Sequence, residues 1–155
     1  MIKPETTIKE CLEYMKNIKV NSYKLVQDPS GTLYFAHSNS LFEYYFTPNF
    51  LEEGEYYVQV YWNEEEIYQT DTVKFKELNK KDIKKILSDV IYEVEKKKRI
   101  VKDEEGHTYL IPQYISKKFS NILDEAYENE DFDEVEYLFG KYMYGGPMSK
   151  LIVLE

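Results

Sequence analysis

The sequence predicts an α+β fold, because apolar residues alternate with polar ones in its first half and recur at helical spacing in its second half. Pro- and Gly-containing turns separate the short strands of the first half. With 155 residues, the chain is long enough to bury a core without disulfides or a structural metal. We therefore predict a single domain over residues 1–155. An alternative subdivision has a β-rich part (1–76) and a mainly helical part (77–155).

The first half is predicted to fold as one helix followed by an antiparallel meander. Ile8, Leu12, Met15 and Ile18 have helical spacing, which predicts a helix over residues 7–18. Thr7 and Glu10 fit a capping box at its start. Turn chemistry at 28–31 and 63–66, together with β-branched and aromatic runs, predicts five strands. These strands are expected at 20–27, 32–37, 41–47, 55–62 and 67–75.

The second half is predicted to begin with a long central helix over about residues 80–97. Its apolar stripe runs from Ile83 to Val94, and Asn79 can cap it. A second hairpin is then expected around the turn 103–106, which a glycine closes. A helical hairpin (114–128, then from Asp131 to about 142) and a short C-terminal strand (150–154) complete the predicted fold.

Charge is segregated along this acidic chain, whose net charge is −9. Residues 41–73 contain ten aromatic side chains and eight carboxylates without any Lys or Arg. Residues 74–102 carry 11 basic and 5 acidic side chains, and residues 103–136 carry 11 acidic and 2 basic ones. Such a layout repels free DNA or RNA, and Arg99 is the single arginine for bidentate phosphate recognition. We predict neither direct nucleic-acid binding nor membrane binding.

Strand alternation sorts the acidic aromatic block into a core face and a polar face. Phe42, Tyr44 and Phe46 are expected to face the core, and the residues between them the solvent. Tyrosine offers rigid contact area and carboxylates mimic phosphate charge, so the polar face suits a Lys/Arg-rich groove. The alternative is a solvated face without function. The predicted partner-binding residues are Glu43, Tyr45, Glu55, Tyr57, Gln59, Tyr61 and Tyr68.

The sequence gives no pattern for catalysis, a cofactor or a metal. His37 and His107 are the only histidines, and neither belongs to a metal-ligand motif, so both are interpreted as surface residues. The acidic stretch 124–136 fails as an EF-hand loop, because Glu134 stands at the required glycine and Gly140 at the bidentate carboxylate. The lone Cys11 is expected to have a small apolar role on a buried helix edge. We predict no enzyme activity, no cofactor and no metal site.

These observations favour a small acidic cytoplasmic binding protein, since the lone cysteine cannot form an internal disulfide and the N-terminus lacks an export pattern. By analogy of size and composition, it is expected to act as an inhibitor or immunity-type protein, such as a phage anti-defence protein or nucleic-acid mimic. Its expected partner is a basic protein that handles nucleic acid. The alternatives are a nucleotide- or sugar-binding protein with an aromatic pocket and a carboxylate-dependent hydrolase.

Overall fold

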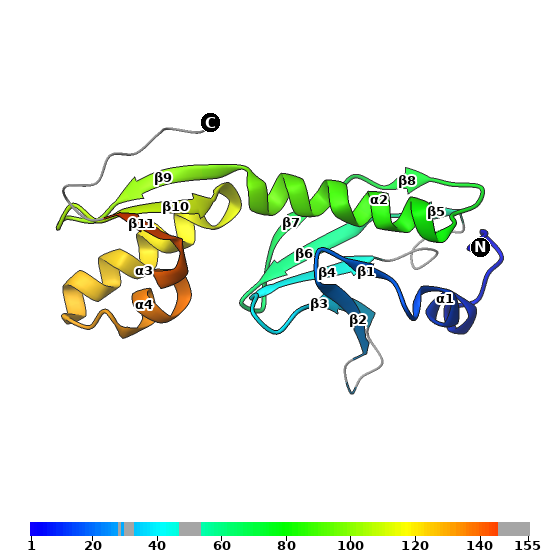
Figure 1. The fold of residues 1–155 in the computed structure, drawn as a ribbon, viewed down its shortest axis with the longest axis horizontal. Helices are drawn as coiled ribbons and strands as arrows, with labels where there is room; N and C mark the ends of the chain where they lie inside the picture. The colour runs from blue at the N-terminus through cyan, green and yellow to red at the C-terminus, as the bar shows by residue number, and fades with distance from the viewer. Residues whose placement is uncertain (28, 30–32, 47–53, 146–155) are drawn as a thin grey trace. The chain divides into compact units, whose positions relative to one another are not determined.

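Both predicted helix caps form. In the computed structural model, which describes residues 1–27, 29, 33–46 and 54–145, α1 (Ile8–Met15) begins after Thr7 and α2 (Lys80–Ile91) after Asn79 (Figure 1). The Thr7 hydroxyl accepts the N–H of Glu10, whose carboxylate accepts the N–H of Thr7. Asn79 and Asp82 exchange the equivalent bonds at 2.8 and 3.0 Å. These reciprocal bonds satisfy N–H groups that the first helical turn leaves without an acceptor.

The predicted antiparallel sheet is confirmed, although it has six strands instead of five. The strands pair in chain order as β1 (Lys19–Val20), β2 (Tyr23–Gln27), β3 (Leu33–Ala36), β4 (Phe42–Phe46), β6 (Val58–Trp62) and β7 (Glu65–Gln69). The predicted strands at 55–62 and 67–75 are each broken. Their remaining parts, β5 (Glu55–Tyr56) and β8 (Val73–Lys74), form a separate two-stranded sheet.

Two tight turns explain how the sheet acquires its extra strand and its register. Asn21 and Ser22 have φ angles of 48° and 73°, and Asn63 and Glu64 have 48° and 68°. Two consecutive positive φ angles are the signature of the hairpin turn whose twist matches that of paired strands. The first turn divides the predicted strand 20–27 into β1 and β2. The second joins β6 directly to β7, which starts two residues earlier than predicted.

The core of this part of the chain lies on one face of the sheet. Burial alternates perfectly along β4 and β6, and the buried side chains include Phe42, Tyr44 and Trp62. Helix α2 lies beside the sheet and contributes buried residues from Ile83 to Ile91 (Figure 1). The predicted buried stripe of the first helix is partly wrong, because Ile8 is 55% exposed while Cys11 and Met15 are buried.

The second half contains the predicted β-hairpin and helical hairpin, with short helical turns at their ends. Its elements are the π-helical turn η1 (Tyr92–Lys96), β9 (Lys98–Lys102), β10 (Thr108–Pro112), the 3₁₀ turn η2 (Gln113–Ile115), α3 (Ser116–Asn129), α4 (Asp133–Phe139), the 3₁₀ turn η3 (Gly140–Tyr142) and β11 (Met143–Gly145). The predicted last helix is α-helical to Phe139 and continues as a 3₁₀ turn to Tyr142, after which β11 pairs with β10. The predicted strand at 150–154 lies outside the described residues.

The described residues fall into two compact units, which we call unit 1 (up to Ile91) and unit 2 (from Tyr92). The boundary coincides with the change from α-helix to π-helix within the predicted 80–97 helix. It therefore differs from the sequence-derived subdivision at 76/77. The core of unit 2 centres on Phe119, whose ring lies 4.8 Å from that of Tyr109 and 5.0 Å from that of Phe139. Among the described helices, none has the length and apolar character needed to cross a membrane.

Candidate functional site

Three tyrosines form a continuous ladder across the sheet face opposite the core. The ring of Tyr45 on β4 stacks on that of Tyr34 on β3, with centroids 5.2 Å apart and planes 23° apart. Its other neighbour is Tyr61 on β6, at 5.0 Å in an edge-to-face arrangement. All three side chains are half-buried. Rings packed in this way present rigid, ordered contact area to a partner.

Strand register places two carboxylates beside this ladder. Glu43 pairs with Tyr61 from the β4 side, and Glu66 pairs with Tyr61 from the β7 side. Directly opposed residues share a face of the sheet, so both acids lie next to the third ring. We define the tyrosine face as Tyr34, Glu43, Tyr45, Gln59, Tyr61 and Glu66. Strands β4, β6 and β7 carry no Lys or Arg, whereas Lys24 lies on the same face in β2, opposite Ala36.

The structure brings four of the predicted partner-binding residues together on the tyrosine face. Glu43 lies opposite Tyr61, and Tyr45 lies opposite Gln59. The expectation that these side chains stand opposite the core is thus met in β4 and β6, where each is partly exposed. Partner binding by these residues remains a prediction.

The other three predicted residues lie elsewhere. Tyr68 pairs with the fully buried Val60 and is therefore on the core face, because the register shifts between Val60 and Tyr61 and reverses the expected alternation. Glu55 pairs with Lys74 in the two-stranded sheet, and Tyr57 lies in the break between β5 and β6. The placement of Tyr68 on the polar face was therefore wrong, and Glu55 lies in a different sheet because the strand predicted over 55–62 is not continuous.

Sequence reasoning missed Tyr34 and Glu66. Tyr34 precedes the buried Phe35, so alternation within the predicted strand 32–37 was the signal that places it on the polar face. Glu66 had no comparable signal, because its position depends on the two-residue turn at Asn63 and Glu64 and on the shift in register.

The histidines and the cysteine have local structural partners. His37 packs edge-on against Tyr23 at 4.9 Å, and its Nδ1 accepts the N–H of Asn39. His107 Nδ1 lies 2.8 Å from the Asp103 carboxylate. Cys11 is buried as expected, and burial raises the pKa of its thiol, with a further contribution from Glu10. Within the described part of the chain, no group of three or more His, Cys, Asp or Glu side chains is arranged to hold a metal ion.

The fold and the tyrosine face together define an α+β protein whose sheet has one core face and one aromatic, acidic face. No protein-family model, curated protein or solved structure matches the chain. Function is therefore inferred from the chemistry of its surfaces.

Proposed function

We propose that this chain is an acidic binding protein that blocks a basic, nucleic-acid-handling protein, in the manner of an inhibitor or immunity protein. The observation that supports the proposal is the ladder Tyr34, Tyr45 and Tyr61 with Glu43 and Glu66 beside its last ring. The tyrosine face is the proposed contact surface.

Arginine is the partner side chain that this arrangement fits best. A guanidinium group is planar, stacks on aromatic rings and forms paired hydrogen bonds with a carboxylate. Glu43 and Glu66 supply carboxylates on both sides of the Tyr61 ring. A groove that binds nucleic acid is rich in such cations, and an acidic aromatic face competes for them with phosphates and bases.

The overall charge of −9 supports the same partner class. Opposite charges speed the encounter of two proteins, and salt screens that attraction over about 8 Å at physiological ionic strength. The partner is therefore expected to associate fastest at low salt, while the stacked tyrosines supply the contact that holds it.

The test is an NMR titration of the ¹⁵N-labelled full chain with a short arginine peptide and with a lysine peptide of equal length. We expect the arginine peptide to bind more tightly and to shift amide signals in β3, β4 and β6. The double substitution Glu43→Gln and Glu66→Gln is expected to weaken binding about tenfold or more, as for the loss of charge-assisted hydrogen bonds.

The matched control is the double substitution Glu5→Gln and Glu13→Gln, which removes two exposed carboxylates from the α1 region and leaves the tyrosine face intact. Equal weakening by both double variants would mean that net charge alone attracts the peptide. Amide shifts confined to other elements would also overturn the proposal.

A further inference from the structure

Unit 2 contains a cavity of about 330 Å³ lined by residues of the β9–β10 hairpin, α3, α4 and β11. Part of its wall is aromatic and apolar, with Leu123, Tyr127, Phe132 and Val135. The rings of Tyr127 and Phe132 meet edge to face at 5.1 Å. This volume is at the lower end of the range for small-molecule sites, so a ligand with a single ring or a short chain fits it.

Acidic groups and one imidazole form the polar part of the wall, namely Asp103, Glu105, His107 and Glu136. Among the residues that the structure describes, no Lys or Arg lines the cavity. Burial raises the pKa of Tyr127, the hydrogen bond with the Glu104 backbone lowers it, and the carboxylates of Asp103, Glu104 and Glu105 raise it. Burial also raises the pKa of Tyr109, assisted by Asp103. The acidic lining, whose charges contribute to both shifts after burial, favours a positively charged ligand.

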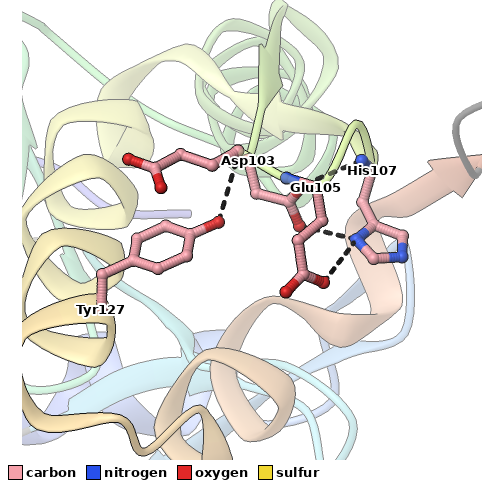
Figure 2. Close-up of polar contacts among 5 residues, drawn as sticks. Asp103, Glu105, His107 and Tyr127 are labelled. Atoms are coloured by element: carbon pink, nitrogen blue, oxygen red, sulfur yellow. Dashed lines mark hydrogen bonds and ion pairs between the residues drawn. The ribbon is translucent and has the colours of Figure 1, made fainter.

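Hydrogen bonds hold the polar groups in place (Figure 2). One Asp103 oxygen accepts the backbone N–H groups of Glu105 (3.0 Å) and His107 (2.8 Å), and the other lies 2.8 Å from His107 Nδ1. The Tyr127 hydroxyl accepts the N–H of Glu104 at 2.8 Å, which ties the hairpin loop to α3. The Asp103 side chain is only 8% exposed, so it orients its neighbours while the more exposed groups remain available to a ligand.

The Asp103 carboxylate engages the imidazole of His107 at Nδ1. The carboxylates of the wall are therefore the groups that can hold the positive charge of a ligand. Glu105 is 69% exposed, and its carboxylate lies 3.8 Å from the same Nδ1. Glu136 adds another carboxylate to the lining. An ammonium group, which donates three hydrogen bonds and accepts none, matches this set of acceptors.

We propose that the cavity binds a small organic ammonium ion with an aromatic or apolar body. The body lies against Leu123, Phe132 and Val135, and the ammonium group is held by the carboxylates of Glu105 and Glu136. This site is in unit 2 and uses none of the residues of the tyrosine face, so it stands or falls independently of the proposed function.

The test compares three probes of matched size with the ¹⁵N-labelled full chain. Phenethylamine carries the ammonium group, 3-phenylpropionate reverses the charge and 3-phenylpropanol is neutral. We expect only phenethylamine to bind and to shift the amide signals of residues 103–107 and of α3 and α4. A fourth probe, a lysine tripeptide with blocked ends, carries its ammonium groups on side chains. Weaker binding of this peptide than of phenethylamine would indicate that the cavity takes a free amine and not the side chain of a protein.

Substitutions then identify the groups that hold the charge. Glu105→Gln combined with Glu136→Gln is expected to weaken phenethylamine binding about tenfold or more, since each charge-assisted hydrogen bond is worth about that factor. The control, Asp124→Asn with Glu128→Gln, removes two exposed carboxylates of α3 that do not line the cavity. Unchanged amide spectra outside the loop verify folding. Equal binding of the neutral or anionic probe, no binding of phenethylamine, or equal weakening by the control overturns the assignment.

Discussion

At the scale of single residues, Tyr142 is the titratable group whose environment most strongly favours one protonation state. Burial is the main cause that raises its pKa above the ordinary value of 10.0, and the charge of Glu95 adds to it. Lys98 and Lys141 place their ammonium groups 5.5 and 5.2 Å from the centre of its ring. The neutral phenol is therefore part of the stable form of unit 2.

The first prediction concerns alkaline pH. A pKa raised on folding means that the contribution of Tyr142 to stability is complete below pH 10.0 and is lost as pH rises beyond it. Tyr142→Phe keeps the ring and its contacts with lysine but cannot ionise. We expect urea unfolding monitored by circular dichroism to show a smaller loss of stability between pH 8 and pH 11 in Tyr142→Phe than in the unchanged chain. An identical loss in both proteins would show that this phenol does not ionise on unfolding.

At the scale of elements, local chemistry explains which parts of the fold could be predicted. The capping boxes at Thr7 and Asn79 involve residues three positions apart, so the sequence alone identifies them. The β9–β10 hairpin likewise follows from Gly106, whose φ is 86°. Turns without glycine were harder to recognise. Ser22 occupies a left-handed position where glycine is common, which concealed the β1–β2 hairpin.

The candidate site was recognised only where strands are regular. Alternation correctly grouped Glu43, Tyr45, Gln59 and Tyr61, because β4 and β6 pair residue by residue. Tyr68 was misplaced because one extra residue in β7 reverses the faces of the strand. Such a shift depends on contacts with β6 that no local pattern encodes. The cavity of unit 2 was not foreseen either, since its walls come from elements that meet only in the folded chain.

The second prediction concerns the β6–β7 turn. Glu64 has a φ of 68°, which costs a residue with a Cβ atom more than it costs glycine. Glu64→Gly is expected to stabilise the fold by about 0.5–1 kcal/mol, as measured by the midpoint of urea unfolding. Glu65→Gly is the matched control, because it places glycine within β7 and should destabilise the fold by about the same amount. A loss of stability in both variants would contradict the assigned turn.

At the scale of the whole molecule, the division at Ile91 and Tyr92 separates two hydrophobic cores. Unit 1 buries Phe35, Tyr44 and Trp62, whereas unit 2 buries Phe119 and Phe139. Because each unit has its own hydrophobic core, each can unfold locally while the other stays folded.

The third prediction tests this independence with reciprocal substitutions. Phe139→Leu removes contacts with Phe119 and is expected to lower the opening free energy of amides in unit 2 by about 1–2 kcal/mol, leaving unit 1 unchanged. Phe35→Leu should lower the opening free energy of amides in unit 1 and leave unit 2 unchanged, because Phe35 is 1% exposed in the core of unit 1. Native-state hydrogen exchange resolved by residue measures both effects. Equal loss of protection in both units would indicate one cooperative fold.

The outer strands of the six-stranded sheet limit how its tyrosines can be used. Strand β1 has only two residues, and the opposite terminal strand, β7, carries Glu65 and Glu66 together with a shift in register. Short, charged or bulged borders discourage the sideways addition of foreign strands, which is the step that starts fibre growth. The sheet can therefore present the tyrosine rings of its face to a partner, while its edge strands resist polymerisation.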